Sequence, residues 1–188
     1  MGQREKIEKL IFQLLQEIGE NPKRDGLKET PQRVAKMFDE LFMGLKSPKF
    51  ADFKTFQKKT NGELIVVAKI PFYSVCEHHL SPFFGDVAIG YIPAQNQTLG
   101  LSKFLRLVAY WSKRPSIQEG LTEIICQELT ENIPNDGVGV LLKARHLCME
   151  MRGVRNPNAL TKTQCFSGEL KTNRQRRVEF FERIKEES

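Results

Sequence analysis

The chain has 188 residues, 40% of them hydrophobic and 28% charged, which suits one globular domain with a buried core and a smaller appendage. No apolar run approaches the roughly 20 residues that a membrane-spanning helix needs, and the charged beginning MGQREKIEKL is unlike a signal peptide, so we expect a cytoplasmic protein without a membrane partner. The net charge of +6 leaves three alternatives open: a nucleic-acid partner, a phosphate-rich small ligand, or no specific partner.

Two amphipathic helices are predicted first along the chain. The first has apolar residues at helical spacing and ends near Gly19. The second begins with Thr30 as its N-cap, and Gly44 closes it. We interpret residues 1–60 as a helical appendage with its linker and residues 61–188 as the main domain.

The main domain is predicted to have the element order ββααββ, followed by a last helix. β-Branched and aromatic residues indicate the strands, and apolar residues at helical spacing indicate the helices. In chain order the segments are ELIVVAKIPF, FFGDVAIGYIP, LSKFLRLVAYWSK, SIQEGLTEIICQELTEN, GVGVLLKARHLCMEM, TQCFSGEL and a helix from about Asn173. Side chains expected on the inner face of the first of these helices are Leu101, Phe104, Leu105 and Val108. The order predicts an α+β protein with an antiparallel sheet and helices on one face.

The basic C-terminal segment KTNRQRRVEFFERIKEES is soon balanced by glutamates. A nucleic-acid-binding arm would interleave aromatic and basic side chains on a groove or a sheet, and this pattern is not found. We therefore predict a solvent-exposed helix face here and no nucleic-acid partner.

Histidine and cysteine cluster in two short stretches about seventy residues apart, VCEHHLSPFFG and HLC. Together these hold His78, His79, His146, Cys76 and Cys148, which are all three histidines and two of the four cysteines. Zinc is bound by thiolate and imidazole, and a catalytic zinc keeps one position open. Cys76 and His79 have the spacing of a chelating pair on a turn, and we expect the third ligand from the HLC stretch.

The HLC stretch lies within the predicted long strand, so His146, Cys148, Glu150 and Arg152 would share one face. His146 and Cys148 would then lie roughly 6–7 Å apart, so that one could bind the metal while the other addresses a substrate. Singly, Cys148 would more often be a buried hydrophobe and His146 a satisfied core histidine. Their clustering favours a metal site.

A structural zinc usually has four cysteine or histidine ligands, and only one C-x-x-H pair is present. The remaining histidines favour acid/base chemistry beside an open zinc. Cys126 and Cys165 have no neighbouring histidine in sequence, and we expect both to be structural. The spacing of a zinc deaminase is absent.

At these motifs the sequence resembles the GTP cyclohydrolase I family, zinc enzymes that convert GTP to 7,8-dihydroneopterin triphosphate and formate. The matching stretches follow the family order over nearly the whole chain: ETPQRVAKM, SVCEHHLSPFFG, GYIP, LGLSKFLRLV, SIQEGLT and HLCMEMRGV. The resemblance implies the tunnelling fold, in which small antiparallel sheets from several subunits join into a barrel. It also implies a homodecamer with sites at subunit interfaces.

The resemblance assigns the zinc ligands as Cys76, His79 and Cys148. It assigns His78 and His146 as catalytic acid/base residues, and Ser102 as an assisting hydroxyl. The implied reaction adds water at guanine C8, which requires protonation at N7, and a histidine suits that task near neutral pH. Formate leaves, and an Amadori-type rearrangement and ring closure follow.

The resemblance further implies that Gln118 and Glu119 read the guanine, because a carboxylate can accept hydrogen bonds from both N1–H and the 2-amino group. The alternative is that Ser116-x-x-Glu119 forms a capping box at a helix start. The triphosphate would be bound by Lys103, Arg106 and Arg152, with a weaker case for Arg33 and Lys36 from a neighbouring subunit. For each of these, solvated surface charge is the alternative.

Two positions depart from the family pattern. Ala88 stands where histidine is common, and Gly120 stands where arginine would follow Gln118 and Glu119. A second hypothesis is therefore a zinc-stabilised nucleotide-binding homologue without catalysis, although both catalytic histidines are retained. A third is a related enzyme acting on another pterin or a deazapurine. Glu77 receives no role.

Overall fold

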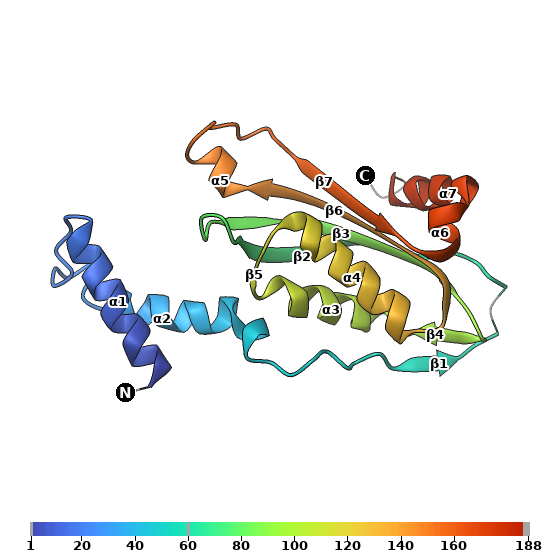
Figure 1. The fold of residues 1–188 in the computed structure, drawn as a ribbon, viewed down its shortest axis with the longest axis horizontal. Helices are drawn as coiled ribbons and strands as arrows, with labels where there is room; N and C mark the ends of the chain where they lie inside the picture. Colours follow the sequence, from blue (N-terminus) through green and yellow to red (C-terminus); the bar gives the residue numbers. More distant parts are fainter. Residues whose placement is uncertain (1, 60, 186–188) are drawn as a thin grey trace. The chain divides into compact units, whose positions relative to one another are not determined.

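The computed structural model describes residues 2–59 and 61–185 (Figure 1). The chain divides into two compact units with the boundary between Ser47 and Pro48. Within the described residues, no helix is both long and apolar enough to cross a membrane.

The first unit is a pair of helices. Its elements are α1 (Gln3–Glu17), α2 (Thr30–Leu41) and the short 3-10 helix η1 (Met43–Leu45). As predicted, α1 ends close to Gly19, whose φ of +86° lies in the left-handed region that glycine tolerates best. An ion pair of 2.7 Å between Arg4 and Asp39 joins α1 to α2.

Two details of the predicted α2 were wrong. Thr30 is the first helical residue rather than the N-cap, which is Glu29. The reason is that the backbone N–H of Thr30 already donates to Leu27 O at 2.8 Å, so the preceding turn runs into the helix one residue early. Gly44 lies inside η1 instead of closing α2.

The second unit is built on a five-stranded sheet in the order β5-β2-β3-β6-β7. All neighbouring strands are antiparallel except β5 and β2. The strands are β2 (Ile65–Cys76), β3 (Pro82–Pro93), β5 (Pro115–Ser116), β6 (Asn135–His146) and β7 (Thr161–Phe166). The helices are α3 (Ser102–Ser112), α4 (Gln118–Asn132), α5 (Leu147–Glu150), α6 (Gly168–Thr172) and α7 (Arg174–Lys185). The predicted ββααββ order and α+β class are confirmed.

A small separate sheet was not predicted. Strand β1 (Thr55–Gln57) pairs with β4 (Gln97–Leu99), so part of the expected linker is folded against the main unit. The Tyr91 hydroxyl accepts a hydrogen bond from Leu99 N at 2.9 Å, which holds β4 near the Pro93 end of β3.

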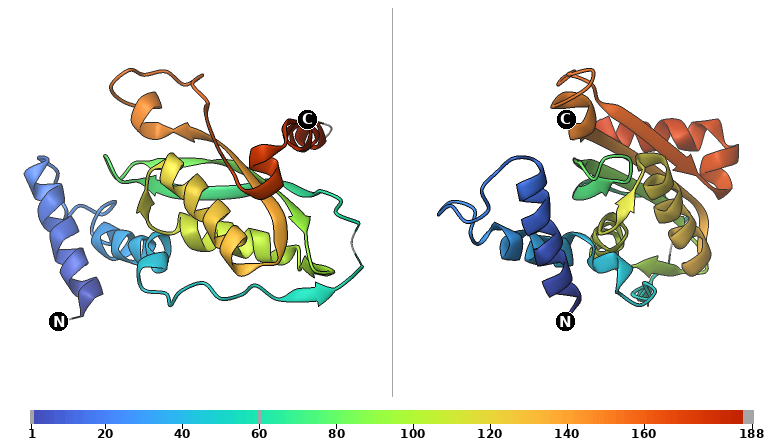
Figure 2. Two further views of the ribbon diagram at one scale, coloured as in Figure 1. Left: turned by 45° about the vertical axis from the view of Figure 1, so that its right-hand side comes forward. Right: turned by 60° about the vertical axis from the view of Figure 1, so that its left-hand side comes forward.

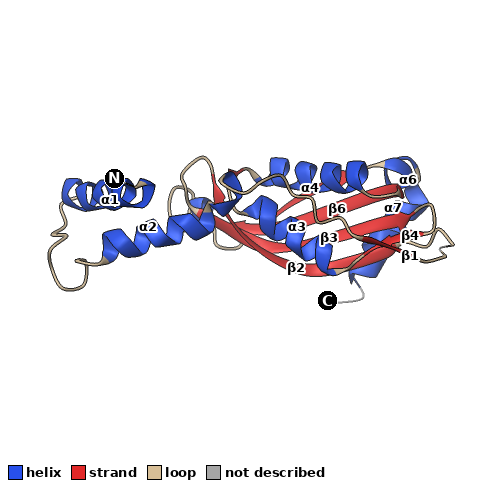
Figure 3. Ribbon diagram, turned by 90° about the horizontal axis from the view of Figure 1, so that it is seen from below, coloured by secondary structure: helices blue, strands red, loops and turns tan. Residues whose placement is uncertain are grey.

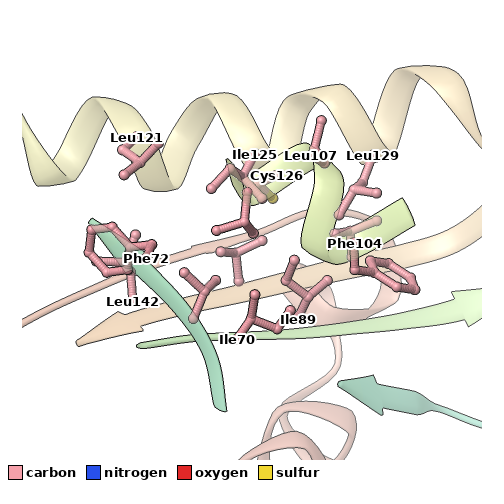
Figure 4. Close-up of a cluster of buried hydrophobic side chains, with 14 of the residues drawn as sticks. Ile70, Phe72, Ile89, Phe104, Leu107, Leu121, Ile125, Cys126, Leu129 and Leu142 are labelled. Carbon is pink, nitrogen blue, oxygen red and sulfur yellow. The ribbon is translucent and has the colours of Figure 1, made fainter. Parts of the chain in front are cut away.

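Helices α3 and α4 lie side by side over one face of the sheet (Figures 1 and 3). Between them and the strands is the main core, where Ile89, Phe104 and Ile125 meet with no exposed surface (Figure 4). The inner stripe of α3 is Phe104, Leu107 and Val108, at helical spacing. Two side chains expected on that face, Leu101 and Leu105, are instead exposed at 59% and 46%. Leu101 is the N-cap, which precedes the first turn of α3, and Leu105 lies to one side of the stripe.

The opposite face of the sheet carries a second, smaller core under the C-terminal helix. Figure 2 shows α7 on the side of the sheet away from α3 and α4. Ala88 is 3% exposed and belongs to this cluster with Leu141 and Phe180. Ala88, which stands where histidine is common in the family pattern, therefore packs against apolar side chains. Gly120 has open space, since an added Cβ would meet only Ile117 at 3.6 Å.

The predicted long strand through HLCMEM was wrong in its second half. Strand β6 ends at His146, and the chain turns into the one-turn helix α5. The physical reason is the loss of pairing partners: β3 pairs with β6 only as far as Phe83↔His146, and β7 only as far as Ala144↔Thr161. The residues after His146 therefore have no strand edge to bond, and the expected strand alternation does not apply to them.

Candidate metal and catalytic site

A cavity of about 240 Å³ opens where β2 and β6 end and α4 begins. Its walls carry most of the chemistry-bearing side chains singled out in the sequence. The lining residues are Cys76, His78, Ile117, Gln118, Glu119, His146, Cys148, Met149 and Thr161. Residues from distant parts of the sequence thus meet at one end of the sheet.

Two thiols and an imidazole converge in this cavity. One ligating atom from each of Cys76, His146 and Cys148 lies within 4.8 Å of the others. Strand β2 delivers Cys76, which is 3% exposed, and the α5 turn brings Cys148 back towards it. Two sulfurs and one imidazole nitrogen are a donor set that zinc accepts in proteins, with a fourth position open. The residues present therefore fit a zinc ion.

The Cys148 thiol is influenced by its surroundings. Burial raises the pKa of Cys148, and the adjacent Cys76 sulfur raises it further. A divalent cation bound between the sulfurs would favour the thiolate forms. Metal binding at this position would therefore release protons.

The imidazole of His146 is held in one orientation. It stacks on Phe83, its cross-strand neighbour, with ring centroids 4.8 Å apart and planes 6° apart. Its Nε2 lies 2.7 Å from Oε1 of Gln118. Burial lowers the pKa of His146, while Glu119 and Glu150 oppose that effect.

The Gln118 amide defines which nitrogen of His146 carries hydrogen. Its Nε2 donates to Leu142 O and Thr161 O, both at 3.2 Å, and to Thr163 Oγ1 at 3.0 Å. Because carbonyl oxygens only accept, Oε1 must face His146, and an amide oxygen also only accepts. His146 Nε2 therefore donates to Gln118, and Nδ1 is the ring atom left to bind a metal or exchange a proton. The sequence pattern had not indicated this contact.

The other two histidines lie on the turn between β2 and β3. His78 is exposed and lines the cavity. His79 is exposed and lies outside the three-donor group; its Nε2 is 3.0 Å from the Arg152 guanidinium. Arginine has no acceptor, so His79 Nε2 accepts this bond and its ring is neutral with the proton on Nδ1. Neighbouring Glu77 contributes a backbone N–H to Ser116 O at 3.2 Å.

The capping box considered for Ser116 and Glu119 is not formed. Ser116 belongs to β5, and its hydroxyl lies 3.3 Å from that of Ser74. The N-cap of α4 is Ile117, without a side-chain capping bond. Glu119 is exposed at the cavity mouth and free of this structural task.

The predicted phosphate-binding residues, together with the predicted assisting hydroxyl of Ser102, are divided between two regions. Arg152 lies near the cavity through its bond to His79. Ser102, Lys103 and Arg106 lie at the beginning of α3, which follows β4 at the far end of β3 (Figure 1). A twelve-residue strand such as β3 is roughly 36 Å long at about 3.3 Å per residue. The two groups therefore lie towards opposite ends of the sheet within one chain.

Asp52 forms ion pairs with both basic side chains at the beginning of α3. Its carboxylate accepts from Lys103 Nζ at 2.6 Å and from Arg106 Nη1 at 2.7 Å. Arg33 and Lys36 belong to the first compact unit, where Arg33 pairs with Glu29 at 2.9 Å.

Comparison with known proteins agrees with the motifs. The family model described as GTP cyclohydrolase I matches residues 7–185. The chain belongs to the GTP cyclohydrolase I family. The resemblance drawn from CEHHL and HLCM is thus confirmed, and this chain is a member of an enzyme family whose match includes both compact units.

Individual relatives align with most of the chain. GTP cyclohydrolase 1 of Enterococcus faecalis is 48% identical over 165 residues, 88% of this chain and 89% of the relative. The bifunctional protein FolKE of Lactococcus lactis subsp. lactis is 46% identical over 184 residues, 96% of this chain and 52% of that protein. Among solved structures, an apo archaeosine synthase QueF-Like has a TM-score of 0.46 and 19% identity, with 58% of this chain and 97% of that chain covered.

Proposed function

We propose that the protein is a zinc-dependent GTP cyclohydrolase I that hydrolyses GTP at guanine C8 to formate and 7,8-dihydroneopterin triphosphate. This is the entry reaction of pterin and folate-type biosynthesis. The observation that carries the proposal is the convergence of Cys76, His146 and Cys148 in one cavity, with His78 and Glu119 on its walls. Family membership supports the choice of substrate.

Zinc would be held by Cys76, His79 and Cys148, with His146 as the adjacent acid/base residue. When bound, the metal supplies Lewis-acid activation of a water molecule. His79 follows Cys76 by three residues on a tight turn, in which Leu80 N donates to Cys76 O at 2.9 Å. Arg152 would have to release the lone pair of His79 Nε2 for that nitrogen to ligate. The proximity of His146 to both cysteines makes it the second candidate for the third ligand.

The chain's own residues would supply the proton chemistry. Gln118 accepts from His146 Nε2, so the proton delivered to guanine N7 or taken from an intermediate would move through His146 Nδ1. His78 is the second histidine within the cavity and would serve the later rearrangement and ring closure, with Ser102 of another subunit assisting. Ile117 and Met149 line the same space and would exclude water around the base.

Guanine recognition would rest on Glu119, whose carboxylate can accept from both N1–H and the 2-amino group. Gln118 is 1% exposed and its amide is fully used within the chain. Its contribution would therefore be to position His146 beside the base.

A complete site would require more than one chain. The proposed triphosphate residues Lys103 and Arg106 lie towards the opposite end of the sheet from Cys76. Strand β7 has β6 as its only neighbour in the described sheet, and β2 is covered on its other edge by just the two residues of β5. Such edges can pair with strands of another copy. This supports an oligomeric barrel, and the family resemblance suggests a decamer in which Arg33 and Lys36 add to a neighbour's site.

The test is turnover of GTP by zinc-loaded protein, with formate and the fluorescent oxidised pterin measured and the metal content determined on the same sample. His146→Ala should retain zinc and lose product formation, whereas Cys148→Ala and His79→Ala should lose both. If His146→Ala lost zinc and His79→Ala retained it, His146 would be the third zinc ligand and His79 the acid/base residue. Absence of product from zinc-loaded wild type would favour the binding homologue without catalysis.

A further inference from the structure

The basic pair Lys103 and Arg106 is neutralised by an acidic side chain of its own chain. The two residues lie one turn apart on α3, and Asp52 places one carboxylate oxygen on each of them, at 2.6 and 2.7 Å. The Lys103 side chain is only 13% exposed. An ammonium with so little contact with water needs an anionic partner, and Asp52 is the partner that the chain provides.

The segment that carries Asp52 is fixed on both sides. The Phe50 ring contacts the rings of Phe53 and Tyr110, with centroids 5.0 and 5.5 Å apart. Both phenylalanines pack on the main core. The Tyr110 hydroxyl donates to Pro48 O at 3.0 Å, and Gly100 N donates to Lys54 O at 3.2 Å. Asp52 is therefore presented to α3 by an anchored segment.

An anchored carboxylate competes with any anion that approaches the same cations. A tethered group acts at an effective concentration in the millimolar range or above. Any anion that binds both cations must first displace this carboxylate, so Asp52 lowers the affinity for a single phosphate and for a polyphosphate chain by about the same factor. A polyphosphate chain has further charged oxygens for other cations, so it can still bind after that loss.

We infer that Asp52 is an internal competitor at the polyphosphate subsite, which exchanges with the polyphosphate chain of the substrate at Lys103 and Arg106 and lowers the affinity of this subsite for anions. The inference rests on the proposed function for the role of these two cations. Consistent with a well-formed contact, Lys103 and then Arg106 hold the pKa of Asp52 below its ordinary value.

The test uses Asp52→Asn, which removes the charge and retains the shape. Binding of inorganic triphosphate and of orthophosphate to the full-length, zinc-loaded protein is measured by calorimetry. Because an exposed ion pair contributes up to about fivefold in an equilibrium constant, D52N should bind orthophosphate and triphosphate each about fivefold more tightly. KM for GTP should decrease more than kcat changes.

Glu123→Gln is the matched control, since it removes one exposed carboxylate from α4 and should leave both affinities unchanged. In the Lys103→Gln background, D52N should give a smaller gain, because only Arg106 is then freed. Asp52→Ser removes the same charge and should reproduce the result. Thermal unfolding verifies that each variant is folded.

Unchanged or weaker anion binding by D52N would overturn the inference and reduce Asp52 to a positioning role. Failure of triphosphate to bind either protein would also overturn it. These outcomes are separable from the proposed function, because anion binding is measured without turnover. If D52N behaves as expected and no GTP is hydrolysed, the proposed function fails and the role of Asp52 remains.

Discussion

The contact between Gln118 and His146 provides a sharp test of how the site works. Replacing Gln118 with Met keeps the length of the side chain but removes both amide groups. The wild-type amide makes four contacts, three through Nε2 and one through Oε1. Because Nε2 has two protons, these amount to about three full hydrogen bonds, and at about 1 kcal/mol each Q118M should lower the free energy of unfolding by about 3 kcal/mol.

The effect on activity has a separate cause. Without Gln118, His146 Nε2 loses the acceptor that selects its tautomer, and the ring can place its proton on Nδ1 instead. Loss of such an orienting partner typically costs about 10- to 100-fold in metal affinity or activity. We expect kcat for GTP to fall by that factor in Q118M, measured with zinc-saturated protein at a temperature where it is fully folded.

Thr122→Val is the matched control for this experiment. The Thr122 hydroxyl donates to Gln118 O at 2.8 Å and lies 2.6 Å from the Thr163 hydroxyl, and neither of these hydrogen bonds involves His146. T122V should therefore destabilise the protein by about 2 kcal/mol, at about 1 kcal/mol for each bond, and retain kcat. If Q118M retained the kcat of T122V despite its loss of stability, the assignment of Gln118 as a positioning residue would be refuted.

Three further predictions concern the surroundings of the site. Burial raises the pKa of Glu128 above its ordinary value of 4.5, so ionising it in the folded state costs free energy once the pH rises above 4.5. Glu128→Gln should therefore raise the melting temperature at pH 7. An equal rise in melting temperature below about pH 4 would contradict this reasoning. Glu150 accepts hydrogen bonds of 2.8 and 2.6 Å from Arg145 and so fixes the α5 turn that carries Cys148. Glu150→Gln should therefore weaken zinc binding about tenfold, measured by competition with a chelating dye. An unchanged zinc affinity would argue against this role of Glu150. An added Cβ on Gly85 would lie 1.9 Å from Lys143 O. Gly85→Ala should therefore lower the free energy of unfolding by about 3 kcal/mol, measured by urea unfolding. A decrease of less than about 1 kcal/mol would show that β3 and β6 can separate locally.

Local sequence was enough to predict the elements that carry the site. The alternating and β-branched segments before and after CEHH became β2 and β3, so the motif was correctly expected at their turn. The chemistry of the donors was also readable, because thiol and imidazole side chains at C-x-x-H spacing have few other common uses. These properties depend on neighbours within a few residues, which the chain order alone supplies.

Other features depended on partners far away in the chain. β6 stops at His146 because its neighbouring strands provide no further edge, and this brings Cys148 towards Cys76 on a helical turn. Gln118 meets His146 only when α4 lies over β6, and the sequence could assign it no role other than binding substrate.

The electrostatics of the basic residues also came from tertiary structure. By sequence, Lys103 and Arg106 were candidates to bind a triphosphate, and nothing near them in the chain indicated that Asp52, about fifty residues earlier, would neutralise both. The sequence by itself determined the family, the order of the main elements along the chain and the types of donor atom, because these follow from residue identity and short spacing. Only the folded chain determined which donors converge, which nitrogen carries a proton and which charges are already paired, because each of these depends on distances between segments remote in sequence.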